Sequence, residues 1–207
     1  MTLSPELSQI LEAILFAAIK HQGQVRKDES GSPYITHPLM VTQTLWEIGN
    51  VRDTRTLIAA ILHDTLEDTT TTSEEISERF GEDILAIVLE VTDDKSLEKM
   101  ERKRLQVVHA PDLSTAAKII KLGDKLVNCR DILYAPPKDW NLERRREYIQ
   151  WGADVVARIR GVNPALEKAF DTMLREAEQR LDYQIQSFQS INQRPWGPNE
   201  NHPSQEE

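Results

Sequence analysis

The chain has 207 residues, of which 39% are hydrophobic, which favours one soluble globular domain, and no apolar run is long enough for a membrane span. Its formal net charge of -9 argues against nucleic acid as a partner, so an anionic ligand must be met by local basic residues or a metal. The single cysteine, Cys129, excludes an internal disulfide and a cysteine-based zinc site, and residues 1–6 lack a secretory signal, which together predict a cytoplasmic protein.

Helical periodicity dominates the first part of the chain. Ser4-Pro5-Glu6 has the residues of a helix start, and apolar residues at helical spacing continue as far as Gln22-Gly23. Residues 23–36 contain glycine, serine, proline and mixed charges, which predicts an ordered loop. A second helix is expected to begin at Pro38 and to end at Gly49.

The rest of the chain continues the helical pattern. Asp53 is predicted to cap a third helix, and Thr72 with Glu75 matches a capping box for a short helix that ends at Phe80-Gly81. Further segments with helical periodicity are 84–91, 113–134, 141–160 and 164–182. No segment shows the alternation of a strand.

We therefore predict an all-α protein with a single helical bundle over residues 1–182. Residues 183–207 are rich in Gln, Asn, Ser, Pro and Glu, and we predict that they form a poorly ordered polar tail. The sequence indicates no oligomeric state.

One imidazole and three carboxylates gather at the end of the third predicted helix. His63 and Glu67 are four residues apart, as are Asp64 and Asp68, so each pair shares a helix face. Three carboxylates this close repel one another unless a cation lies among them or a proton is shared. Taken alone, the run is as consistent with a solvated acidic helix end that carries a core histidine as it is with a functional site.

Two distant residues extend this constellation. His37 lies at a predicted helix start, where a lone histidine more often caps the helix or packs in the core than binds a metal. Asp124 lies in an apolar segment, where an ion pair with Lys121 or Lys125 would explain a buried acid. A metal is the alternative that also explains the crowded carboxylates. Such a nitrogen and oxygen donor set suits Mn, Fe, Co or Zn and can activate a water molecule. The candidate ligands are His37, His63, Asp64 and Asp124.

Basic residues lie in three runs elsewhere in the chain, at 26–27, 95–104 and 144–146. Any one run is by default a solvated face, but beside a metal site some of these residues could hold a polyphosphate through charge-assisted hydrogen bonds. Tyr148 could stack on a base, although an aromatic residue at a helical position is more often core.

An ordered set of segments runs through the chain: 21–27, 33–38, 60–69, 91–95, 101–106 and 121–131. In the same order and with compatible spacing, these segments resemble the HD hydrolase domain of the RelA/SpoT family. The resemblance covers residues 5–180 approximately and is closest to the small stand-alone hydrolases of that family found in metazoa. Gly123 departs from the pattern, since alanine is usual there, and glycine inside a helix costs about 1 kcal/mol relative to alanine.

The resemblance implies an HD-domain enzyme that hydrolyses the alarmones ppGpp and pppGpp at the 3′-diphosphate, giving GDP or GTP and pyrophosphate, with Mn²⁺ as the metal. It implies that the four candidate ligands bind the metal and that Glu67 and Asp68 handle the attacking water and the leaving group. The residues that it places near the small-molecule nucleotide are Arg26, Lys27, Asn128 and Tyr148.

Three alternatives accompany this interpretation. The same metal site could act on another nucleotide, such as an adenosine-based alarmone or the 2′-phosphate of NADPH. The chain could be a non-catalytic module that binds alarmones, although such a module has no need of Glu67 and Asp68. It could also be a structural bundle whose acidic residues are merely solvated.

Overall fold

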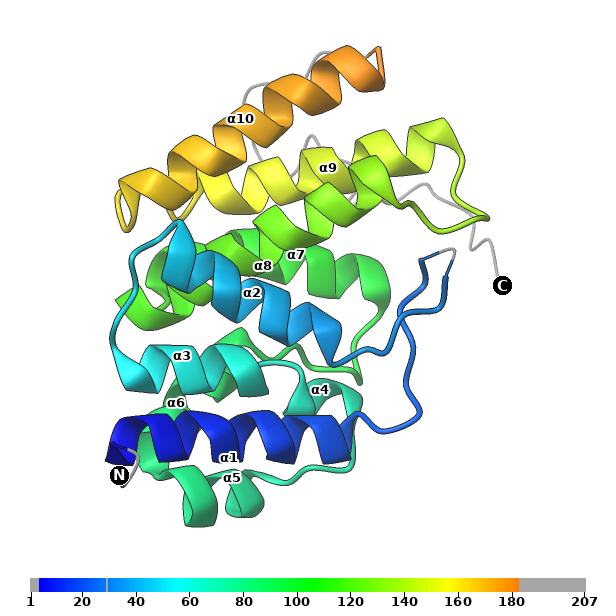
Figure 1. Cartoon of the computed structure of the whole chain (residues 1–207). Helices are drawn as coiled ribbons and strands as arrows, with labels where there is room; N and C mark the ends of the chain where they lie inside the picture. The colour runs from blue at the N-terminus through cyan, green and yellow to red at the C-terminus, as the bar shows by residue number, and fades with distance from the viewer. Residues whose placement is uncertain (1–3, 29, 183–207) are drawn as a thin grey trace.

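The computed structural model describes residues 4–28 and 30–182, and the regular elements there are helical (Figure 1). An isolated bridge between Val25 and Pro33 is the only strand-like pairing in this described part. The all-α prediction is confirmed. The elements are α1 (Pro5–Lys20), α2 (Thr36–Glu47), α3 (Thr54–Leu62), α4 (Thr65–Asp68), α5 (Ser73–Phe80), α6 (Glu82–Val91), α7 (Lys99–His109), η1 (Ala110–Asp112), α8 (Thr115–Tyr134), α9 (Leu142–Ala157) and α10 (Pro164–Arg180).

Side-chain caps fix the predicted helix starts. The Ser4 hydroxyl accepts a hydrogen bond from the backbone of the first turn of α1, and Asp53 does the same for α3. The capping box of α5 is complete, because Thr72 and Glu75 each accept from the other's backbone N–H. These local interactions explain why the sequence predicted where α1, α3 and α5 begin. Helix α2 has no side-chain cap, and it begins at Thr36 and not at the predicted Pro38.

The helices stack from α1 and α5 at one end of the molecule to α10 at the other, with α2 and α8 between them (Figure 1). Helix α8 is central, since it packs against α2, α3, α6, α9 and α10. Its apolar residues Ile120, Leu122 and Leu126 are fully buried. The helix that carries Asp124 is therefore fixed from several sides by the core.

A close approach of α8 to α2 explains the unusual Gly123. A Cβ atom at this position would lie 2.7 Å from Cδ2 of Leu45 and 3.5 Å from Cγ1 of Val41, so alanine would require Leu45 to move. The loss of helix propensity at Gly123 thus accompanies tight packing between the two helices that carry His37 and Asp124.

Helix α7 was not predicted. It is polar, and Val107 is its only buried residue, so the apolar periodicity on which the prediction relied is missing. Val107 packs with Trp151 and Val155 in a small cluster beside the main core, and Trp151 donates a hydrogen bond to the Lys103 carbonyl. The helix is therefore fixed by contacts with α9 that its own sequence does not reveal.

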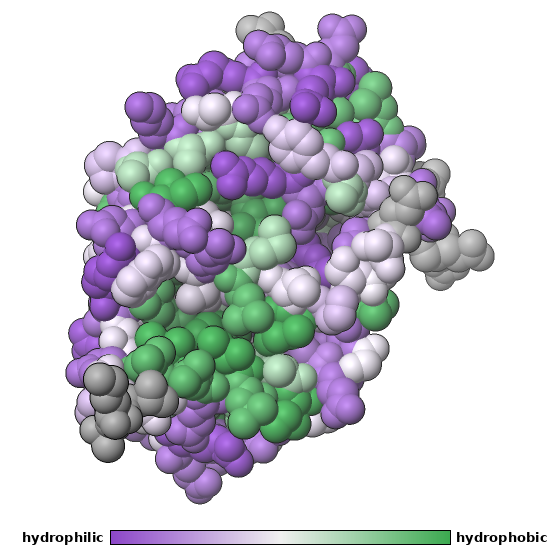
Figure 2. Space-filling view, in the orientation of Figure 1, coloured by the Kyte–Doolittle hydropathy of each residue, from purple (hydrophilic) through white to green (hydrophobic). Residues whose placement is uncertain are grey.

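An apolar stripe runs along the exposed side of α1 (Figure 2). Leu7, Leu11, Leu15 and Ile19 follow one another at four-residue spacing and are each 42–62% exposed.

Among the described residues, no helix has both the length and the apolar character required to cross a membrane. The predicted tail, 183–207, lies outside the described residues.

Candidate metal centre and active site

The four candidate ligands converge from three parts of the chain. His37 lies on α2, His63 and Asp64 lie between α3 and α4, and Asp124 lies on α8. One donor atom each of His37, His63 and Asp124 lies within 4.8 Å of the others. Asp64 Oδ2 completes the group, 3.7 Å from His37 Nε2 and 3.2 Å from His63 Nε2. The structure thus brings together all four residues.

The hydrogen bonding of His63 shows that this cluster fits a metal cation. Its Nδ1 lies 2.8 Å from the Ala60 carbonyl and must donate to it, which leaves a lone pair on Nε2 in the neutral ring. Nε2 is buried and has no hydrogen-bond partner among the described residues, yet it faces the Asp64 carboxylate. Lone pairs that face one another in this way are stabilised by a cation between them.

The electrostatics of the cluster favour positive charge at its centre. Burial alone would lower the pKa of His63, but the carboxylates of Asp64 and Asp124 outweigh burial and raise it well above its ordinary value. Burial would raise the pKa of Asp64, but the neighbouring imidazoles hold it below its ordinary value. The cluster therefore favours positive charge at its centre, which protons or a divalent metal ion can supply.

Asp124 forms an ion pair with Lys125, which was considered as a simpler explanation for a buried acid, and it also faces the imidazoles. Lys125 Nζ lies 3.0 Å from Asp124 Oδ2, while Oδ1 accepts a hydrogen bond of 2.6 Å from Asn128 and lies 3.1 Å from His37 Nε2. Despite burial, Lys125 and the imidazoles hold the pKa of Asp124 well below its ordinary value. The lysine orients one carboxylate oxygen and leaves the other facing the histidines.

Glu67 and Asp68 are neighbours in sequence but have different surroundings. Glu67 accepts a hydrogen bond of 3.1 Å from the Asp93 backbone N–H, and its other oxygen lies 3.5 Å from Arg102 Nη1. Burial and the nearby Asp93 carboxylate raise the pKa of Glu67 to about 7. Asp68 instead forms an ion pair with Lys95. Glu67 is thus the acid that can gain or lose a proton near neutral pH.

Tyr34 is a residue at the site that was not assigned a role from the sequence. Its hydroxyl lies 2.7 Å from Asp64 Oδ2 and 3.1 Å from Asp68 Oδ2, so it joins a candidate ligand to a candidate catalytic acid. Burial and these carboxylates raise the pKa of Tyr34, which keeps the phenol protonated and able to donate. Its place in the segment 33–38 was a signal, but its contacts depend on the fold.

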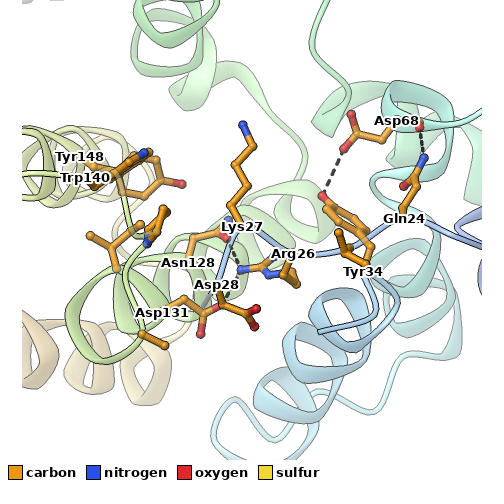
Figure 3. Close-up of a pocket in the computed structure, with 14 residues that line it drawn as sticks. Gln24, Arg26, Lys27, Asp28, Tyr34, Asp68, Asn128, Asp131, Trp140 and Tyr148 are labelled. Atoms are coloured by element: carbon orange, nitrogen blue, oxygen red, sulfur yellow. Dashed lines mark hydrogen bonds and ion pairs between the residues drawn. The ribbon is translucent and has the colours of Figure 1, made fainter. Parts of the chain in front are cut away.

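A cavity of about 530 Å³ opens beside the cluster (Figure 3). Arg26 donates a hydrogen bond of 3.3 Å to Asn128 and forms an ion pair with Asp131, and the Lys27 side chain extends into the space between Tyr148 and Tyr34. The predicted nucleotide-binding residues all line this cavity: Arg26, Lys27, Asn128 and Tyr148.

Tyr148 is in contact with two tryptophan rings. The ring centroids of Trp140 and Trp151 lie 5.4 Å and 5.3 Å from that of Tyr148. Tyr148 is therefore at once a packed aromatic residue and part of the cavity wall. Trp140, which also lines the cavity, was not predicted as a site residue.

Residues 13–160 match the family described as HD domain. The chain is 52% identical over 174 residues to the guanosine-3′,5′-bis(diphosphate) 3′-pyrophosphohydrolase MESH1 of Xenopus tropicalis, which covers 84% of this chain and 97% of the relative. It is 47% identical to the protein of the same name from Homo sapiens, with 83% and 96% covered.

A solved structure is also similar. It is described by the words "A metazoan ortholog of SpoT hydrolyzes ppGpp and plays a role in starvation responses". The two chains superpose with a TM-score of 0.80 at 43% identity, over 85% of this chain and 97% of the other.

Proposed function

This chain belongs to the HD domain family, among the relatives named guanosine-3′,5′-bis(diphosphate) 3′-pyrophosphohydrolase, and we propose that it hydrolyses ppGpp and pppGpp at the 3′-diphosphate. The products are GDP or GTP and pyrophosphate. The observation that carries this proposal is the convergence of His37, His63, Asp64 and Asp124 beside the partly buried acid Glu67, next to a cavity large enough for a nucleotide.

We propose Mn²⁺ as the metal, held by the two imidazoles and the two carboxylates. A mixed nitrogen and oxygen donor set of this kind suits Mn²⁺, which when bound lowers the pKa of water and neutralises phosphate oxygens. Lys125 and Asn128 orient Asp124 for this role, and the Ala60 carbonyl orients His63.

The reaction is an attack of water on the phosphorus attached to the ribose 3′-oxygen. A bond forms between the water oxygen and phosphorus, the bond from phosphorus to the 3′-oxygen breaks, and the 3′-oxygen takes up a proton from the surrounding water. Glu67 accepts the proton of the water, because its pKa of about 7 allows both protonation states near neutral pH. Asp68, held by Lys95 and Tyr34, helps to orient the reactants.

The large cavity takes the nucleoside and its 5′-phosphates. Arg26 and Lys27 offer positive charge in its wall, Asn128 connects it to Asp124, and Tyr148 offers an aromatic ring to the base. Lys27 also lines an adjoining cavity of about 490 Å³ together with Lys99 and Arg144, which extends the basic surface beyond the first cavity.

The test is incubation of the metal-loaded protein with ppGpp, followed by separation of the products. GDP and pyrophosphate are expected, and intact ppGpp would contradict the proposal. A panel with an adenosine-based alarmone and NADPH identifies a different substrate preference. Tight binding of ppGpp without turnover would instead favour the binding module. A cytoplasmic location, which the single cysteine and the lack of a secretory signal predicted, stays a prediction.

A further inference from the structure

Three cavities form a series across the active site. The large cavity of about 530 Å³ shares Tyr34, Asp68, Asn128 and Tyr148 with a smaller cavity of about 190 Å³, which also contains the metal cluster. We call the smaller one the catalytic cavity. A third cavity of about 240 Å³ shares Asp93, Gln106 and Lys121 with the catalytic cavity and shares no residue with the large one. These three shared residues therefore mark the end of the catalytic cavity that is remote from the nucleoside.

Lys121 is the exceptional residue at this remote end. Lys121 is only 6% exposed. Its ammonium makes no ion pair or hydrogen bond with any residue in the described part of the chain, whereas Lys125 pairs with Asp124. Its neighbours in the wall have partners, since Gln106 donates to Asp93 and Asp93 donates to Glu67. The ammonium of this largely buried residue faces the two cavities without a direct partner, so an anion in the adjoining space would stabilise it.

The other lysine of the catalytic cavity is already occupied. Lys125 pairs with Asp124 at 3.0 Å and lies 4.3 Å from the centroid of the Trp151 ring. The carboxylates that line the cavity are Asp64, Glu67, Asp68, Asp93 and Asp124. An anion with several charges that enters this cavity therefore needs Lys121 in addition to the metal.

We infer that Lys121 is a further catalytic residue, whose ammonium binds the 3′-diphosphate in the catalytic cavity and remains bound to the pyrophosphate product. This inference rests on the proposed function, because that function identifies the anion. With the nucleoside in the large cavity, the 3′-diphosphate points past the metal cluster toward the remote end. Lys121 stands there to share the negative charge of the phosphoryl oxygens as the bond to the 3′-oxygen breaks.

The protonation of Lys121 is compatible with this role. Burial and the nearby Lys125 lower its pKa to about 8, which still leaves it mainly charged at neutral pH. A bound diphosphate would raise the pKa again, because an adjacent anion favours the charged form. Lys121 can therefore remain an ammonium throughout the reaction.

The test compares Lys121→Met with Lys118→Met, which removes a lysine one turn earlier on α8 that lines none of these cavities. Inorganic pyrophosphate and GDP are titrated separately into the metal-loaded proteins by calorimetry. Lys121→Met should weaken the binding of pyrophosphate by roughly tenfold or more, because a charge-assisted hydrogen bond is lost, and should leave the binding of GDP within about twofold. Its kcat for ppGpp should fall by about a hundredfold. Lys118→Met should match the wild type.

Each possible outcome bears on the inference. Lys121→Arg, which keeps the charge, should retain most of the pyrophosphate binding. Unchanged binding of pyrophosphate by folded, metal-loaded Lys121→Met would overturn the inference. If that variant does not fold, Lys121→Gln takes its place, and loss of the fold in both would assign Lys121 a structural role and equally overturn it. A wild-type protein that leaves ppGpp intact contradicts the proposed function instead, and the pyrophosphate titration still tests the anion site.

Discussion

Replacement of Glu67 by glutamine should slow the reaction and stabilise the fold at once. Glutamine is nearly isosteric with protonated glutamate and can still accept the hydrogen bond from the Asp93 backbone N–H. It cannot accept a proton from water, so kcat should fall by about 10²–10⁴-fold with the bound metal retained. The gain in stability follows from the removal of a buried negative charge.

The size of that gain depends on pH. The pKa of Glu67 is about 7 in the folded protein against an ordinary value of 4.5, so the folded state binds the proton more tightly than the unfolded state. The wild type therefore loses stability as pH rises from the ordinary value through the folded one. The shift corresponds to about 3 kcal/mol, which screening of the partly exposed side chain reduces to about 2 kcal/mol.

The assay is chemical denaturation of the metal-free proteins at pH 5 and pH 8, with calorimetry as a second measurement. Glu67→Gln should exceed the wild type by about 2 kcal/mol at pH 8, which is roughly 4–8 °C in Tm, and by less than about 1 kcal/mol at pH 5. The control is Glu78→Gln on the exposed face of α5, which should change neither rate nor stability appreciably. A normal rate of Glu67→Gln would refute its catalytic role, and an equal gain at both pH values would refute the argument from burial.

Three further predictions concern the metal, the packing and the nucleotide. Asp124→Ala should lose bound metal and activity together, because it removes a carboxylate that faces both imidazoles, and metal analysis showing wild-type content would contradict this. Gly152→Ala should destabilise the fold by about 2 kcal/mol, because its Cβ would lie 2.6 Å from Cys129 Sγ. Adding Cys129→Ala should restore most of the loss in a denaturation experiment, and additive losses would show that this contact is not the cause. Arg26→Met should raise KM for ppGpp by about tenfold with normal metal content, since it removes a cation from the wall of the large cavity, and an unchanged KM would exclude Arg26 from substrate binding.

The sequence predicted those parts of the fold that local interactions decide. The starts of α1, α3 and α5 were predicted because Ser4, Asp53 and Thr72 cap them within one turn. Helix α7 was missed because only Val107 is buried on it, so its position depends on contacts with α9. Likewise, the glycine at 123 was noted as an exception from the sequence, but its reason lies in the approach of Leu45 from α2.

At the candidate site, too, some features could be predicted from the sequence and others depend on the fold. Residue type made His37, His63, Asp64 and Asp124 candidate ligands, and the family resemblance implied that they act together, as the fold places them. The different surroundings of Glu67 and Asp68 were not predictable, because their partners lie on distant segments: Asp93 and Arg102 for the first, Tyr34 and Lys95 for the second.

Lys121 was considered from the sequence only as an ion-pair partner of Asp124. The structure assigns that pairing to Lys125 and leaves Lys121 facing two cavities. Such a difference between two lysines one turn apart depends on side-chain direction within the core, which no local pattern encodes.

The central claim, metal-dependent hydrolysis at the 3′-diphosphate, is tested most directly by the fate of a water oxygen. The Mn²⁺-loaded protein is incubated with ppGpp in water labelled with ¹⁸O, and the products are analysed by mass spectrometry. We predict GDP without label and pyrophosphate with one labelled oxygen, and no turnover after the metal is removed. Intact ppGpp, or label in GDP in place of pyrophosphate, would contradict the proposed reaction.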